Sequence, residues 1–382
     1  MTSVTPHGFE TRVLRIPLVA PFETSFGRQD EREVILVRAV TAGAEGWGEC
    51  VTMPMPLYSS EHTEGAWDVL HRFLYPALLG VGPINPRHVA GRVEHIVGHR
   101  MTKAAVELAL LDAALHERDE SFASYLGADR THVPSGVSVG IMPSLDALLA
   151  TVQDYLDQGY ARIKIKIRPG WDVEPTRLLR RTFGDDLLLQ VDANAAYTLS
   201  DARLLRQLDD LGLLLIEQPL AEDDLVQHAA LATQLQTPIC LDESIVSAKV
   251  AADAITLGAT QVINVKAGRV GGYLEAVRIH DVARAHGVPV WCGGMLETGV
   301  GRAANAALAA LPGFTLPGDI SASDRFYAQD VTDPFVLDEG RIAVPTGPGL
   351  GVEVDAERLE AVTVRQSWTP APGHEAAAVV GL

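Results

Sequence analysis

Five charged residues recur at a nearly constant interval through the middle of the chain. They are a lysine, three carboxylates and a second lysine: Lys166, Asp192, Glu217, Asp242 and Lys266. The steps between them are 26, 25, 25 and 24 residues, which is the length of one strand, one helix and two loops. Each residue therefore holds the same place in successive βα units, at the C-terminal end of a strand. This end is where barrel enzymes build their active sites.

The three carboxylates predict a metal site. Acids that converge on one point repel one another unless a cation lies among them. An all-oxygen ligand set favours a hard divalent ion, Mg²⁺ or Mn²⁺, over zinc. Any one of these acids could be a solvated loop charge or a helix cap, but five charges in register indicate a site.

The lysines predict acid–base chemistry. Strand side chains alternate, so Lys164 and Lys166 in "RIKIKI" share one face and the isoleucines share the other. A desolvated lysine close to other cations should have a depressed pKa, which would make it a usable general base. Lys166 and Lys266 lie at the two ends of the arc of charges, so we expect one on each face of a metal-bound substrate. This suits α-proton abstraction from a carboxylate substrate through an enediolate.

The elements that position these residues follow from apolar patterning. From about residue 131, eight short apolar runs alternate with amphipathic helices, which favours a closed (β/α) barrel, with an open doubly wound sheet as the alternative. The preceding part shows strands followed by helices and predicts an α+β module that ends near residue 130. Glu243 follows Asp242, so alternation predicts that it points to the other face, where a supporting or helix-side role is expected in place of metal ligation. Residues 369–382 are expected to form a flexible tail.

Composition limits the setting and the partners. The 382 residues carry a net charge of −18, which argues against a nucleic-acid partner. Three scattered cysteines indicate reduced thiols, and no signal peptide or apolar run of about 18 residues is present. These features predict a cytoplasmic protein without a membrane segment.

Longer motifs carry a resemblance to a known family. "KIK", "DAN", "EQP", "DES" and "NVKAGRVGG", in this order, resemble the muconate-lactonising-enzyme subgroup of the enolase superfamily. "WGECVTMPMPLYSSE" and "WCGGMLETGVGRAANAALAALPGFTLPGDISASDRFY" are similar to the o-succinylbenzoate synthase / N-acylamino acid racemase (N-succinylamino acid racemase) family. The likeness extends over about residues 8 to 368.

This resemblance implies a fold and a set of site residues. The fold is α/β, a modified (β/α)₇β TIM-type barrel (131–326) with an N-terminal α+β capping domain (1–130) that residues 327–368 complete. The resemblance implies Mg²⁺ (or Mn²⁺ or Co²⁺) on the three carboxylates, with Lys166 and Lys266 as acid–base residues. Lys164 would lie beside the base and the substrate carboxylate, and Arg269 would tune Lys266. The remaining residues implied to line the substrate pocket are Phe22, Met53, Ser138, Asn194, Gly294, Met295 and Phe326.

The family resemblance leaves the reaction open. Racemisation of an N-acylamino acid needs both lysines, whereas dehydration to o-succinylbenzoate needs one base and a nearby cation, and we expect both activities. The alternatives are o-succinylbenzoate synthesis for menaquinone as the sole role, muconate lactonisation, or a non-catalytic metal-binding protein. Dipeptide epimerases have a DxD pair where this chain has Asp319-Ile320-Ser321. The expected partner is a small carboxylate substrate, and homo-oligomers are usual in such families.

Overall fold

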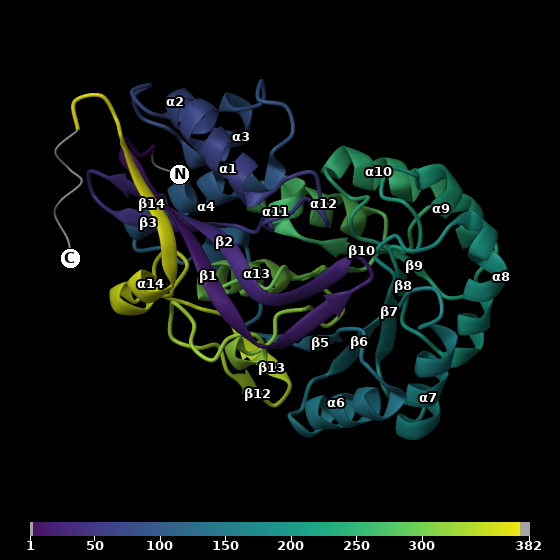
Figure 1. Cartoon of the computed structure of the whole chain (residues 1–382). Helices are drawn as coiled ribbons and strands as arrows, with labels where there is room; N and C mark the ends of the chain where they lie inside the picture. The colour runs from purple at the N-terminus through teal and green to yellow at the C-terminus, as the bar shows by residue number, and fades with distance from the viewer. Residues whose placement is uncertain (1–2, 375–382) are drawn as a thin grey trace.

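The structure, a computed structural model, describes residues 3–374. It contains a long antiparallel sheet flanked by helices and a barrel of parallel strands surrounded by helices (Figure 1). The hairpin at the end of the antiparallel sheet touches the barrel mouth. The Glu23 carbonyl oxygen accepts a hydrogen bond from Ile141 N at 2.9 Å, and Ser25 Oγ donates to Asn194 O at 3.3 Å. The first part of the chain therefore reaches the C-terminal ends of the barrel strands.

The antiparallel sheet has the strand order β14-β1-β2-β3. Its strands are β1 (Pro6–Thr24), β2 (Gly27–Thr41), β3 (Glu45–Cys50) and β14 (Thr363–Pro370). Two glycines let β3 lie directly against helix α4 (Arg100–His116). A Cβ atom on Gly46 would be 2.1 Å from Ala113 N, and one on Gly48 would be 2.0 Å from Ala105 O. Only glycine permits this approach of strand to helix.

Helix α4 is buried along nearly its whole length, which its apolar sequence on all sides explains. The other helices of this part are short. They are α1 (Thr63–Val69), a π-helical turn (Leu70–Leu74), α2 (Tyr75–Leu78), a 3₁₀ turn (Pro86–His88), α3 (Val89–Arg92) and α5 (Phe122–Leu126).

Seven parallel strands lie side by side in chain order and form most of the barrel. They are β5 (Gly136–Val139), β6 (Arg162–Lys166), β7 (Leu189–Asp192), β8 (Ile216–Glu217), β9 (Ile239–Leu241), β10 (Val262–Val265) and β11 (Val290–Cys292). Residues 314–318 close the ring, because Phe314 bridges to Val290 and Gly318 bridges to Ser135. The predicted closed barrel is confirmed, but its eighth strand is reduced to two isolated bridges. Pro317 lacks the N–H that a continuous ladder would need there.

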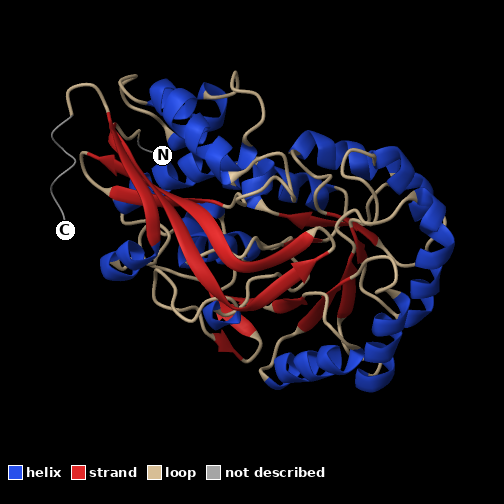
Figure 2. Ribbon diagram, viewed as in Figure 1, coloured by secondary structure: helices blue, strands red, loops and turns tan. Residues whose placement is uncertain are grey.

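Helices cover the outside of the barrel strands (Figure 2). They are α6 (Leu145–Asp157), α7 (Val173–Phe183), α8 (Ala202–Leu205) with 3₁₀ turns at Leu199–Asp201 and Arg206–Leu211, α9 (Leu225–Ala232), α10 (Ala248–Leu257), α11 (Ala267–Val270), α12 (Tyr273–Ala285) and α13 (Gly299–Ala309). Among residues 3–374, no helix is both long and apolar enough to cross a membrane.

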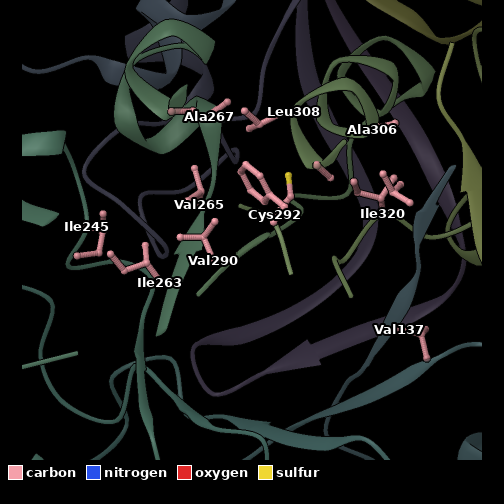
Figure 3. Packing of buried hydrophobic residues seen from close by; sticks show 14 of the residues in the cluster. Val137, Ile245, Ile263, Val265, Ala267, Val290, Cys292, Ala306, Leu308 and Ile320 are labelled. Carbon is pink, nitrogen blue, oxygen red and sulfur yellow. The ribbon is translucent and has the colours of Figure 1, made fainter. Parts of the chain in front are cut away.

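The core between strands and helices is apolar. Figure 3 shows Val265 of β10 and Cys292 of β11 among the residues that pack with Leu308 of α13 and Ile320. In β6 the predicted alternation holds: Ile163 and Ile165 belong to this cluster, whereas Lys164 and Lys166 line a cavity at the barrel mouth. The outward-facing residues pack in the core and hold the strand in place, whereas the inward-facing residues line the cavity.

The C-terminal part returns to the antiparallel sheet. After a 3₁₀ turn (Ser323–Arg325), β12 (Leu337–Asp338) and β13 (Arg341–Ala343) form a small sheet with β4 (His132–Pro134), and α14 (Ala356–Val362) leads into β14. The predicted start of the flexible tail, at residue 369, is too early, because Thr369 and Pro370 pair with β1. The partner strand lies at the other end of the chain, so no local pattern marks this pairing. Residues 375–382 of the expected tail lie outside the described residues.

Candidate active site

The five periodic residues lie at the C-terminal ends of consecutive barrel strands. Lys166, Asp192 and Glu217 are the last residues of β6, β7 and β8, and they are register partners across the sheet. Asp242 and Lys266 come directly after β9 and β10. All five are at most 7% exposed. The even spacing in sequence therefore corresponds to one level of the barrel mouth.

Lys166 and Lys266 lie on opposite walls of this mouth. Counting residues 314–318, the ring has eight segments, and β6 and β10 are four segments apart. Both lysines line two adjoining cavities, whose walls also share Phe22, Gly294 and Leu296. A small molecule at the junction of these cavities would have one lysine on each side.

Lys166 is held by two neighbours on the β7 side. Its Nζ donates to Asp192 Oδ2 at 2.5 Å and to Asn194 Oδ1 at 2.8 Å. Asn194 has a positive φ of 42° and in turn donates through Nδ2 to Glu243 Oε1 at 2.9 Å. The ammonium position is thus fixed by a chain of hydrogen bonds along the mouth.

Lys266 is held from two domains. Its Nζ donates to Asp242 Oδ2 at 2.8 Å and to the hydroxyl of Tyr58 at 3.1 Å. Arg269 donates to the other oxygen of Asp242 and, at 3.1 Å, to the same Tyr58 hydroxyl. Arg269 therefore does not touch Lys266 itself, and any influence it has passes through Asp242 and Tyr58.

Lys164 lies deeper in the barrel and is tied into an ionic network. Its Nζ is 3.1 Å from Glu217 Oε2 and 2.5 Å from Asp319 Oδ2, and it lies over the Trp291 ring at 4.8 Å from the centroid. Arg162, which is fully buried, donates to the other oxygen of Asp319 at 2.8 Å. Asp319 thus neutralises two buried cations.

The predicted depression of the lysine pKa values is wrong for Lys164 and Lys266 in this structure. Burial by itself lowers the pKa of Lys266, but the neighbouring Tyr58 and Glu243 raise it above the ordinary lysine value. For Lys164, burial is likewise outweighed, mainly by Asp319, and the pKa is raised. The neighbouring cations are evident from the sequence, whereas the number of carboxylates in contact with each ammonium group is not.

The three candidate metal ligands are buried and close to lysines. Burial raises the pKa of Asp192, but Lys166 and Lys164 lower it to about 2. Burial, with the charge of Asp192, raises the pKa of Glu217. In the described part of the chain, no three His, Cys, Asp or Glu side chains are gathered as a metal would gather them. The ammonium and guanidinium groups lie between the carboxylates and neutralise them.

The other predicted pocket residues all line one of the two cavities. Phe22, Ser138, Gly294 and Phe326 line the first, and Phe22, Met53, Asn194, Gly294 and Met295 line the second. Phe22 and Phe326 meet edge to face with ring centroids 6.0 Å apart. The first part of the chain therefore supplies pocket wall, as the family resemblance implies.

Four residues that were not among the predicted catalytic, metal-binding or substrate-binding residues also lie there. Tyr58 has no spacing that links it to the barrel strands, so no pattern could find it. Asp319 follows the eighth barrel segment, in the same position as the periodic acids, and could have been recognised. The role of Arg162 could not be recognised, because in the sequence Arg162 is simply the first residue of the strand β6. Glu243 was expected to point to the other face in a supporting or helix-side role. Alternation ends with β9 at Leu241, and the side chain supports the site by accepting a hydrogen bond from Asn194.

Comparison with known proteins adds to this geometry. Residues 9–127 match the family "Mandelate racemase / muconate lactonizing enzyme, N-terminal domain", and residues 147–358 match "Enolase C-terminal domain-like". An N-succinylamino acid racemase of an Amycolatopsis species is 62% identical over 361 residues, which cover 94% of this chain and 98% of the relative. An o-succinylbenzoate synthase of Geobacillus kaustophilus is 48% identical over 354 residues, covering 92% and 94%.

A crystal structure of an enolase-superfamily member from Listeria innocua superposes with a TM-score of 0.92 at 39% identity, covering 96% of this chain and all of that one. The capping sheet, the barrel and the five residues at its mouth thus occur in a chain that matches both family domains. The chain belongs to the enolase superfamily, in the family of N-succinylamino acid racemases and o-succinylbenzoate synthases.

Proposed function

We propose that this chain racemises N-acylamino acids, with N-succinylamino acids as preferred substrates, by moving the α-proton between two lysines. The observation that carries this proposal is the location of Lys166 and Lys266 on opposite walls of one pocket. Racemisation requires a proton to leave one face of the α-carbon and another to arrive on the opposite face. Two lysines on one wall could not do this.

The chemistry of the donor set at the mouth fits a divalent metal, although its carboxylates are paired here with ammonium and guanidinium groups. Asp192, Glu217 and Asp242 offer buried carboxylate oxygens on three neighbouring strands, which suits Mg²⁺ or Mn²⁺. A divalent cation held by these residues would bind the substrate carboxylate, stabilise the charge that develops on it, and compete with the ammonium groups for the same oxygens.

The protein's own side chains then have separate tasks. Asn194 orients Lys166, and Tyr58 orients Lys266, each by a hydrogen bond to Nζ. The lysine that is neutral takes the α-proton, and the protonated lysine opposite delivers one, so the two exchange roles between the two directions of the reaction. Phe22 and Met53 close the pocket from the capping side and limit access of water.

A second activity, dehydration to o-succinylbenzoate, is favoured by the location of Lys164 and Lys166 on one wall. One base on that wall can take the proton and return it to the leaving hydroxyl, while Lys266 stabilises negative charge from across the pocket. Both reactions start with loss of a proton next to a carboxylate. Relatives named for each reaction match this chain over more than nine-tenths of its length.

The test is α-hydrogen exchange in D₂O with each enantiomer of N-succinylphenylalanine and Mg²⁺. Lys166→Ala and Lys266→Ala should each abolish racemisation, and each should leave exchange from one enantiomer only, the opposite one in the two variants. Lys249→Ala is the matched control, since Lys249 is exposed on α10 and pairs with Asp253 on the same helix. Racemisation that survives Lys166→Ala would refute the two-base mechanism. Parallel kcat/KM values for o-succinylbenzoate formation would rank the two activities.

A further inference from the structure

Arg325 lines the same cavity as the catalytic lysines but belongs to no element that the periodic pattern marks. It ends the 3₁₀ turn Ser323–Arg325, just after the segment that closes the barrel. Its guanidinium carbon lies over three aromatic rings, at 4.7 Å from the centroid of Phe326, 5.1 Å from Tyr155 and 5.7 Å from Phe22. These rings fix the plane of the guanidinium in the pocket wall.

Arg325 differs from the other cations of this cavity in its partners. Lys164, Lys166 and Lys266 each have a carboxylate oxygen within 3.1 Å. Arg325 has no carboxylate within 4.0 Å among residues 3–374, and Nη2 donates only to the Ser138 carbonyl oxygen, at 2.9 Å. Its Nε is buried without a hydrogen-bond partner. Burial lowers the pKa of this guanidinium, so an anion beside it would stabilise the charged form.

A second orphaned group lies next to it. The hydroxyl of Ser138 is also buried without a partner, and Ser138 lines the same cavity. Buried polar groups in native proteins are nearly always satisfied, so two unsatisfied donors at one place indicate a ligand group that is bound there. A guanidinium and a hydroxyl together suit a carboxylate.

The positions of Ser138 and Arg325 in the barrel indicate which part of a substrate would contact them. Ser138 lies on β5, which is four segments from β9 and therefore opposite Asp242. Proton transfer takes place between β6 and β10. Arg325 is thus on the side of the pocket away from Asp242 and off the axis between the two lysines, where a substituent of the reacting carbon can extend.

We propose that Arg325, assisted by the hydroxyl of Ser138, binds the distal carboxylate of a succinyl group on the substrate. This inference rests on the proposed function, because it assumes that the reacting carbon lies between the two lysines. It also explains how one pocket serves two reactions, since an N-succinylamino acid and the precursor of o-succinylbenzoate both carry a succinyl group. Arg325 is a binding residue and takes no part in proton transfer.

The experiment compares three substrates on the full-length, Mg²⁺-loaded enzyme. They are the N-succinyl, N-succinamoyl and N-acetyl derivatives of phenylalanine; the succinamoyl group has the shape of succinyl without its charge. The wild-type enzyme should prefer succinyl over succinamoyl in kcat/KM. Arg325→Met should lower kcat/KM for the succinyl substrate by about tenfold to a hundredfold, the range of one charge-assisted hydrogen bond. The other two substrates should change by less than about threefold, and Arg325→Lys should restore part of the preference.

Controls separate this inference from a structural role and from the proposed function. Arg168→Gln removes a charge at an exposed site paired with Glu23 and should leave the preference unchanged. If Arg325→Met lowers kcat/KM for all three substrates alike, Arg325 only packs against the rings and the inference is overturned. A wild-type enzyme without preference for succinyl over succinamoyl overturns it too. If wild type racemises none of the three, the proposed function itself fails.

The inference can be tested even if Arg325→Met does not fold. Thermal unfolding of Arg325→Met shows whether it folds, and Ser138→Ala gives a second route that spares the aromatic stack. Ser138→Ala should lower the succinyl-over-succinamoyl preference by about threefold to tenfold, as loss of one neutral hydrogen bond predicts. If Arg325→Met does not fold, an unchanged preference in Ser138→Ala would refute the proposal.

Discussion

Gly293 offers a way to displace Lys266 by adding a single methyl group. It follows β11 directly, and its φ lies outside the left-handed region, so alanine fits the backbone. A Cβ atom there would be 2.2 Å from Asn264 Oδ1 and 2.7 Å from Lys266 Cε. Both side chains must move in Gly293→Ala, and neither is changed chemically.

The size of the effect follows from these distances. To reach a carbon–carbon contact of about 3.5 Å, Lys266 Cε must retreat by about 0.8 Å. Misplacement of a catalytic group by about 1 Å costs about a hundredfold in rate, and overpacking of a filled core costs about 1–3 kcal/mol of unfolding free energy. We therefore expect kcat for racemisation to fall by about a hundredfold in a protein that still folds.

The assay is α-hydrogen exchange from each enantiomer at saturating Mg²⁺, together with thermal unfolding. Exchange from the enantiomer that Lys266 serves should fall, and exchange from the one that Lys166 serves should persist. Gly91→Ala is the control, because a Cβ at Gly91 of α3 meets nothing within 4 Å. Equal loss of exchange from both enantiomers, or an unchanged kcat, would show that the position of Lys266 does not limit the reaction.

Three further predictions concern stability. Asp319→Asn should destabilise the fold by about 3–5 kcal/mol, since it leaves Arg162 buried without its carboxylate and removes one of the carboxylates that Lys164 contacts. These two cations outweigh burial and hold the pKa of Asp319 below its usual range. Urea unfolding should therefore show that the wild type loses this stabilisation as pH falls below about 4 and that the variant does not. Burial, with Glu297, raises the pKa of Glu49 to about 7, so unfolding free energy should decrease by up to about 3 kcal/mol as pH rises from about 4.5 to 7, and Glu49→Gln should flatten this part of the profile. Addition of Mg²⁺ should raise Tm, and changing all three candidate ligands to their amides should abolish that rise; an unchanged rise would place the metal elsewhere.

The barrel and its five mouth residues could be predicted because their order is a property of the repeat. Once the chain alternates strand and helix, every C-terminal strand end lies at one rim, and the interval of about 25 residues identifies the side chains there. Asp319 obeys the same rule after residues 314–318. In the sequence it stands as the first half of a DxD pair whose second acid is absent, whereas in the structure its contacts with Lys164 and Arg162 make it part of the network.

Other features depend on contacts between distant parts of the chain, which no local pattern encodes. Tyr58 reaches Lys266 across 208 positions of sequence, and Arg325 reaches Ser138 across 187. The direction of the Lys266 pKa shift has the same origin, because it depends on Tyr58 and on carboxylates from several strands. A count of neighbouring lysines in one strand could not give it.

Charge balance connects the two ends of the pocket. At the reacting end each lysine already has a carboxylate, so a divalent cation would add positive charge that the substrate carboxylate can neutralise. At the other end Arg325 has no carboxylate, and a neutral acyl group would leave its charge buried and uncompensated. A substrate with two carboxylates satisfies both ends, whereas an N-acetylamino acid satisfies one. In the proposed mechanism, substrate choice therefore depends on β5 and the turn that carries Arg325, while proton transfer depends on β6 and β10. A change on one pair of walls should then alter one property without the other.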